Sequence, residues 1–169
     1  PVRRPDKNWP KARYDELIQR LKRRRPNHRI AILGDPRGAY YVDGVPSGCL
    51  DLVNVDPGIR LDAHIAVLNR AALAVGGMSG GMVLALYCGC PSLVFGFVNE
   101  QHMYDRDNYL RTLLVYYPYM TARASEISRL ADGMLEGRIP PPDRPQWDPT
   151  EYLGLLAIGL GKVRRFFSV

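Results

Sequence analysis

The apolar positions of the chain follow two different periods, and the change from one to the other predicts alternating helices and strands. Recurrence every three or four residues predicts amphipathic helices at 11–25, 61–72 and 121–137, and two more apolar helices are expected at 82–87 and 151–167. Short apolar runs predict buried strands at 29–33, 50–55, 73–76, 92–97 and 113–117. Thr121 is the expected cap of its helix, and the polar segment 99–109 is expected to be a loop. This order predicts an α/β fold: an open, mostly parallel, Rossmann-like sheet flanked by helices.

The centre of the pattern is the segment 73–97, in which a strand, a glycine-rich turn, a helix and a second strand follow one another. Such a βαβ unit has parallel strands and is almost always right-handed. Its turn contains Gly77, Ser79, Gly80 and Gly81, and it would leave unpaired N–H groups at a helix N-terminus, where anions bind. Ser79 could donate its hydroxyl, and the next two glycines could leave their amides open to a phosphate. Alternatively, the glycines only let the helix and the strand pack closely.

Two other loops are expected at the same edge of the sheet, because the carboxyl ends of parallel strands meet there. The three loops are 34–35, 76–81 and 96–100. Ligands of open α/β sheets bind beyond these strand ends. Their convergence therefore predicts a site for a phosphate-containing ligand.

The sequence Gly77-Met78-Ser79-Gly80-Gly81 also matches G-x-S-x-G, the nucleophile elbow of α/β-hydrolases. That mechanism needs an acid and then a histidine after the serine. The one histidine after Ser79 is His102, and the one acid between them is Glu100, two residues earlier in the same loop. A hydrolase is therefore a less favoured alternative. No lysine follows the glycines, as it would in a P-loop, and no G-x-G-x-x-G fingerprint follows the first strand.

The net charge of +6 suits a phosphorylated ligand or an acidic surface. Much of this charge lies in the runs 22–25 and 162–165, so a solvated basic face is an equally open interpretation. No basic, aromatic-rich sheet and no helix-turn-helix pattern is present, and we expect no nucleic-acid partner.

The three cysteines are Cys49, Cys88 and Cys90, and no CxxC pair or histidine cluster accompanies them. We expect reduced thiols and no metal site. No signal peptide and no apolar run of about 18 residues is present in the sequence. These features predict a cytoplasmic protein.

Four segments carry a resemblance to a known family: the basic, proline-containing entry Lys7-Asn8-Trp9-Pro10, and the stretches 30–34, 61–68 and 74–96. In these segments the chain resembles the C-terminal, donor-binding half of a GT-B glycosyltransferase, and within that group the heptosyltransferase-like enzymes. The most specific part is the Ser-Gly turn with the small residues that follow it. The chain departs from the family pattern at 81–83, where Gly-Met-Val stands in place of Pro-Met-His.

The resemblance implies transfer of a sugar from a nucleoside-diphosphate sugar to a glycan or lipid-linked acceptor. It implies that Ser79, Gly80 and Gly81, in the turn that starts at Gly77, hold the diphosphate together with Lys7. Gly34 and Asp35 would line the base and ribose pocket, and Asn99 and Glu100 would lie near the ribose or the sugar. No metal or other cofactor is implied. The catalytic residues are expected on an N-terminal, acceptor-binding half that this sequence does not contain.

Two units are expected: a nucleotide-sugar donor-binding domain at 1–138, and a proline-rich strap with an apolar, basic-ended helix at 139–169. That helix could pack on a protein domain, or it could make a peripheral contact at the inner face of the membrane. We expect the isolated chain to be inactive as an enzyme. A non-catalytic nucleotide- or phosphate-binding module is the alternative function.

Overall fold

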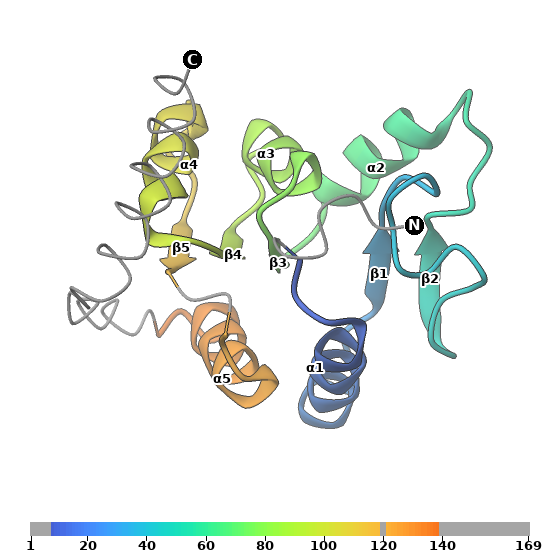
Figure 1. Cartoon of the computed structure of the whole chain (residues 1–169), viewed down its shortest axis with the longest axis horizontal. Coiled ribbons are helices and arrows are strands. Elements are labelled where there is room, and N and C mark those ends of the chain that lie inside the picture. The colour runs from blue at the N-terminus through green and yellow to red at the C-terminus, as the bar shows by residue number, and fades with distance from the viewer. Residues whose placement is uncertain (1–7, 119–120, 139–169) are drawn as a thin grey trace, which may run out of the picture.

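The computed structural model describes residues 8–118 and 121–138. The predicted strap and final helix, and Lys7, lie outside these ranges. The described chain is an α/β unit in which helices and short strands alternate (Figure 1). Its elements are α1 (Lys11–Arg24), β1 (Ile30–Leu33), β2 (Cys49–Leu52), α2 (Arg60–Leu68), β3 (Ala74–Gly77), α3 (Gly80–Tyr87), β4 (Ser92–Phe95), the 3₁₀ helix η2 (Val98–Glu100), α4 (Gln101–Asp107), β5 (Leu114–Tyr117) and α5 (Ala124–Leu135).

Every strand pair in the described residues is parallel, which confirms the predicted fold class. They form two sheets, β1-β2 and β3-β4-β5, rather than one continuous sheet. In Figure 1 the two sheets lie side by side, with β1 next to β3. Within the described chain no strand pairing joins β1 to β3, and we call this interruption between the two sheets the break. The chain passes from β1 to β2 in one direction and from β3 to β5 in the other. The break is therefore the topological switch point, where ligands of such folds bind.

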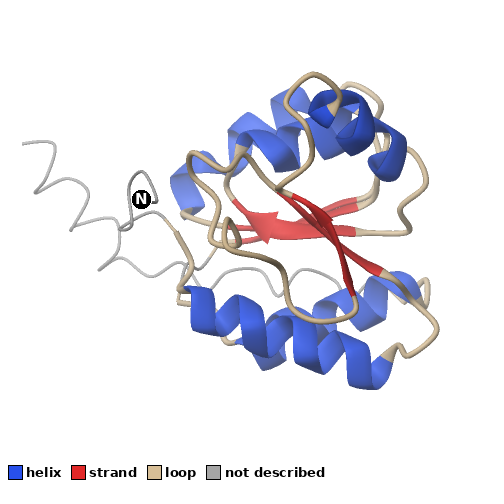
Figure 2. Ribbon diagram, turned by 90° about the vertical axis from the view of Figure 1, so that its right-hand side faces the viewer, coloured by secondary structure: helices blue, strands red, loops and turns tan. Residues whose placement is uncertain are grey.

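Helices cover both faces of the strand layer (Figure 2). Figure 1 shows α1 and α5 on one face and α2, α3 and α4 on the other. Beneath α1 and α5, Trp9, Leu93 and Ile127 belong to one buried apolar cluster. Beneath α3 and α4, Leu86 and Val94 belong to a second. The apolar runs thus form strands because both of their faces are covered.

Tyr14 of α1 lies at the break between the sheets. The N–H of Ala74 donates to the carbonyl of Pro91 beside β4 (2.8 Å), so by alternation the N–H of Gly77 points away from β4. That N–H donates to the hydroxyl of Tyr14 (3.3 Å), whose ring lies 5.0 Å from the ring of Trp9. Burial raises the pKa of Tyr14 to about 12. The neutral Tyr14 hydroxyl therefore accepts the Gly77 N–H, where a neighbouring strand would otherwise supply a carbonyl.

Several predicted boundaries were wrong for local reasons. The strand expected at 50–55 ends at Leu52, because the Asp51 carboxylate accepts the N–H groups of Val53 (2.9 Å) and Asn54 (3.1 Å). The helix expected to extend to residue 72 ends at Leu68, and the chain turns there as Ala71 N–H donates to the Leu68 carbonyl.

Two predictions about helices near the C-terminal half were also wrong. The segment 99–109, predicted to be a loop, contains η2 and α4, a helix too short to show a repeated apolar period. Helix α5 starts after Arg123 instead of Thr121, because the Glu126 carboxylate accepts the Arg123 N–H (2.7 Å) and satisfies the start of the helix there.

Candidate functional site

The glycine-rich turn forms the start of α3 at the carboxyl end of β3, beside the break. Ser79 caps the helix: its backbone is extended (φ −160°, ψ 161°) and its hydroxyl accepts the Met82 N–H (3.4 Å). Gly80 and Gly81 are the first two helical residues and both are exposed. No hydrogen bond within the described residues uses their N–H groups. These amides, at the positive end of α3, are available to an anion.

The glycines of this region differ in what the fold requires of them. A Cβ on Gly76 would lie 2.8 Å from the Met82 Sδ, and one on Gly96 would lie 2.3 Å from the Met78 Cγ. One on Gly77 would lie 3.1 Å from the Tyr14 hydroxyl, and one on Gly34 would lie 2.8 Å from the Ala39 Cβ. At these positions an added methyl group would crowd a neighbouring side chain, so glycine serves the packing of the fold.

Gly80 and Gly81 have no such packing reason. A Cβ on Gly80 would meet nothing within 4 Å, and one on Gly81 would make an ordinary 3.6 Å contact with the Ser79 hydroxyl. Neither residue has a positive φ. Glycine is less favourable than alanine in a helix, by up to about 1 kcal/mol in a helix interior, so two glycines at a helix start without a steric or backbone requirement point to a role outside the fold. A close approach of a ligand to the backbone is such a role.

Two buried tyrosines support the turn from inside the domain. The Ser79 N–H donates to the Tyr104 hydroxyl (2.9 Å), and the Tyr116 hydroxyl donates to the Phe97 carbonyl (2.8 Å). The two tyrosine rings lie 5.7 Å apart. Burial raises the pKa of both residues. Sequence reasoning missed the support from Tyr104, because a single tyrosine in a polar segment carries no signal of burial.

The loop after β1 brings Gly34 and Asp35 to the other side of the break. The Arg37 guanidinium donates to both Asp35 oxygens (3.0 and 2.7 Å), and this hydrogen bonding holds the pKa of Asp35 well below its usual range. Arg60, which sequence reasoning also missed, adds a second positive charge near Asp35. Its Nη2 donates to the Val55 carbonyl (3.0 Å), and its buried Nε has no hydrogen-bond partner within the described part of the chain.

The third predicted loop follows β4. Asn99 is exposed and Glu100 is half-buried in η2. The charge of Glu100 contributes to the raised pKa of Tyr104 and of Tyr116, which places its carboxylate near the tyrosines below Ser79. Tyr104 thus bonds the Ser79 backbone through its hydroxyl and lies within reach of the charge of Glu100.

Other features of the described residues bear on the alternative functions. The Ser79 hydroxyl accepts a helix N–H, and among residues 8–118 and 121–138 no hydrogen bond joins it to His102. In the same part of the chain, no cluster of three or more His, Cys, Asp or Glu side chains could hold a metal, and no helix is long and apolar enough to cross a membrane. The three cysteines are free thiols, and burial raises the pKa of Cys90 to about 11.

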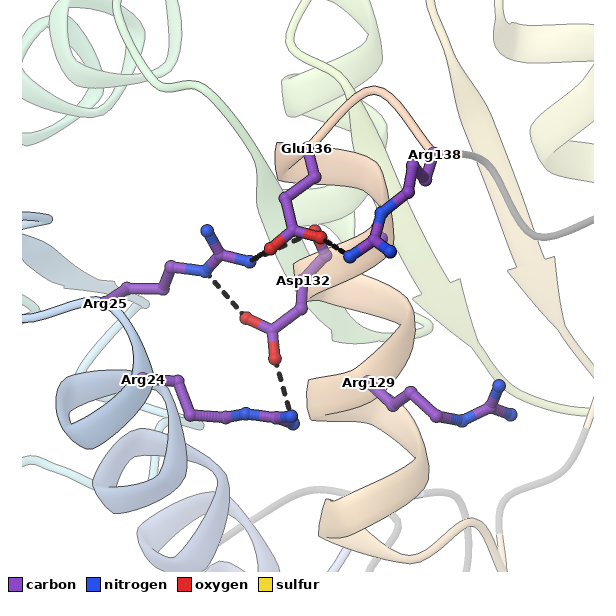
Figure 3. Close-up of a pocket in the computed structure, with 7 residues that line it drawn as sticks. Arg24, Arg25, Arg129, Asp132, Glu136 and Arg138 are labelled. Atoms are coloured by element: carbon purple, nitrogen blue, oxygen red, sulfur yellow. Dashed lines mark hydrogen bonds and ion pairs between the residues drawn. The ribbon is translucent and has the colours of Figure 1, made fainter.

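A separate cavity of about 510 Å³ lies between α1 and α5 (Figure 3). Asp132 pairs with Arg24 (2.9 Å) and Arg25 (2.8 Å), and Glu136 pairs with Arg25 and Arg138. In Figure 3 these charges converge in the cavity, whereas Arg129 points away. Three residues of the basic run 22–25 therefore have partners within the fold. Arg24 and Arg25 pair with Asp132 and so join the two helices, and Lys22 donates to the Ser47 carbonyl. The two carboxylates pair with Arg24, Arg25 and Arg138 and neutralise part of the positive charge of this cavity.

The fold, the switch point and the exposed amides at the start of α3 are features of nucleotide-binding α/β domains. The family model for glycosyltransferase family 9 (heptosyltransferase) matches residues 2–104. The chain belongs to this family, and its class of activity is glycosyl transfer. No curated protein and no solved structure matches the chain.

Proposed function

We propose that this chain is the donor-binding part of a glycosyltransferase, the C-terminal half of a GT-B architecture. In this proposal residues 1–138 bind a nucleoside-diphosphate sugar, which a complete enzyme transfers to a glycan or lipid-linked acceptor. The observation that carries the proposal is the pair Gly80 and Gly81: their amides are exposed at a helix start, and the fold itself has no need for glycine there. Membership of glycosyltransferase family 9 supports it independently.

The chemistry explains why such amides would accelerate the reaction. The nucleoside diphosphate gains negative charge as the glycosidic bond breaks. Fixed N–H groups at the start of α3 would stabilise that charge without reorganising, and Lys7 would add a positive charge from the entry segment. Neither group requires a metal ion.

The other donor contacts would come from both sides of the break. Gly34 and Asp35 would face the base and ribose, with Asp35 held ionised by Arg37. Asn99 and Glu100 would face the ribose or sugar. The general base and the acceptor site would lie on an N-terminal half, so the isolated chain would bind donor without turning it over. A cytoplasmic enzyme of this kind would reach a lipid-linked acceptor through a peripheral contact with the membrane.

Calorimetric titration with a panel of nucleoside diphosphates and their sugars tests this function. We expect one diphosphate to bind, its mononucleotide to bind more weakly, and Gly80→Ala to weaken the diphosphate about tenfold, because a methyl group would stand where the phosphate approaches. Ser125→Ala, at the second position of α5, is the control and should bind like the wild type.

No binding of any diphosphate by the folded chain would reject the donor role. A diphosphate that binds equally well to Gly80→Ala, Ser79→Ala and the wild type would move the site elsewhere. Joining the chain to an acceptor-binding half distinguishes a transferase from a non-catalytic binding module, because sugar transfer is expected only of the former.

A further inference from the structure

The turn that carries the exposed amides is only weakly fixed by its own residues. Two consecutive glycines have more backbone freedom than any other pair, and they form the first turn of α3. The cap bond between the Ser79 hydroxyl and the Met82 N–H is long, at 3.4 Å. An oxyanion site works only when its donors are held in place before the ligand arrives. Something outside the turn must therefore restrain it.

Tyr104 supplies a shorter bond from a different element. Its hydroxyl accepts the Ser79 N–H at 2.9 Å, at the residue that sets the direction of the first turn. Tyr104 itself is 5% exposed, and its ring is buried with Met82 and Leu86 of α3. Its burial keeps the ring in one position and raises the pKa of the hydroxyl, so no charge forms at this support in the ordinary pH range.

The neighbouring tyrosine keeps this support in place. Tyr116 of β5 contacts the Tyr104 ring, and its own hydroxyl bonds the Phe97 carbonyl and contacts the Met78 Sδ. Met78 immediately precedes Ser79. The turn is therefore held on its inner side by hydroxyls from α4 and β5, while its outer side is open.

We propose that Tyr104 is a positioning residue for the diphosphate site: its hydroxyl fixes the Ser79 backbone and so sets the direction of the Gly80 and Gly81 N–H groups. This inference depends on the proposed function for the identity of the ligand. It assigns Tyr104 no contact with the donor. The Ser79 N–H is already occupied by Tyr104, so the ligand receives the two glycine amides and the serine hydroxyl.

Tyr104→Phe tests the inference, because it removes the hydroxyl and keeps the buried ring. The matched control is Tyr41→Phe. Tyr41 is also buried, and its hydroxyl donates to the Asp15 carboxylate (2.8 Å) instead of to a group of α3. Inorganic pyrophosphate is the first probe, because it needs no knowledge of the base. We expect Tyr104→Phe to weaken pyrophosphate about fivefold to tenfold and the control to leave it unchanged.

A second measurement needs no ligand. In ¹H–¹⁵N spectra, Tyr104→Phe should shift the Ser79, Gly80 and Gly81 amides, whereas Tyr41→Phe should not. In hydrogen exchange, Tyr104→Phe should raise the rate of the Ser79 N–H, because the variant removes its hydrogen-bond partner. Unchanged glycine amides would overturn the inference whether or not the chain binds a diphosphate. If the amides shift but the chain binds neither pyrophosphate nor any nucleoside diphosphate, the proposed function is rejected. In that case Tyr104 supports the turn but positions no ligand site.

Discussion

Glycines of the same loop system have different roles, and alanine substitutions separate them. A methyl group at Gly96 would lie 2.3 Å from the Met78 Cγ and 2.6 Å from the Tyr116 hydroxyl. We expect Gly96→Ala to lower the free energy of unfolding by about 1–3 kcal/mol, as overpacking usually does. Gly80→Ala should leave it unchanged or raise it by about 1 kcal/mol, because the site is open and alanine favours the helix. Urea unfolding of both variants measures the difference, and equal losses at the two positions would contradict it.

The buried hydroxyl of Tyr14 makes stability depend on alkaline pH. Burial raises its folded-state pKa to about 12, above its ordinary value of 10. Its contribution is therefore complete below about pH 10 and is lost as the pH rises through the folded-state pKa. Between about pH 8 and about pH 11 the wild type should lose about 1 kcal/mol more than Tyr14→Phe in urea unfolding.

Comparing the two proteins cancels the similar alkaline effect of Cys90, whose pKa burial raises to about 11 and which both retain. Identical pH dependence in the two would show that Tyr14 does not titrate across the folding transition.

At the scale of elements, α1 and α5 are joined by charges as well as by their apolar faces. The Asp132 side chain is 11% exposed and lies between Arg24 and Arg25. Asp132→Asn would leave two guanidiniums without this carboxylate, and we expect a loss of about 2–3 kcal/mol in the free energy of unfolding. Glu16→Gln, which breaks the exposed Glu16–Arg20 pair, should cost less than about 0.5 kcal/mol. A similar small cost for both variants would mean that apolar packing alone joins the helices.

The elements that the sequence predicted correctly are those whose apolar pattern is decided locally. Helix α1 and strands β1, β3, β4 and β5 agree with the predicted segments to within about two residues, because each has a clear period or a continuous apolar run. Helix α4 was missed because its buried face consists mainly of Tyr104. Tyr104 is buried by contacts with Tyr116 and Leu86, which are distant in sequence, so a local sequence pattern cannot predict its burial.

The candidate site was predictable in part for the same reason. The turn at 77–81 and the loops after β1 and β4 follow from strand order, and the structure places them at the carboxyl ends of the strands. The sequence could not show which glycines are needed for packing and which are exposed. That difference depends on the side chains of Met78, Met82 and Tyr14, which come close to the glycines only in the folded chain. The roles of Ser79, Gly80 and Gly81 toward a donor stay predictions.

At the scale of the whole molecule, the break between the sheets divides the backbone hydrogen bonding into two parts. Within residues 8–118 and 121–138, strand β4 has a partner on each side, whereas β1 and β2 pair only with each other. A two-stranded sheet is marginal by itself, so β1-β2 depends on packing against side chains such as Ile18 and Tyr41. Parts of a protein with fewer backbone partners open more readily than the centre of its core.

This division predicts two levels of protection in native-state hydrogen exchange. The hydrogen-bonded amides of 30–33 and 49–52 should exchange with a smaller opening free energy, and a weaker dependence on denaturant, than those of 92–95, because β1-β2 can open without exposing the core below α5. The β4 amides, whose opening requires both neighbouring strands to separate, should exchange through global unfolding. One common opening free energy for all three strands would mean that Tyr14 and the helices couple the two sheets into a single cooperative unit, despite the break in their hydrogen bonding.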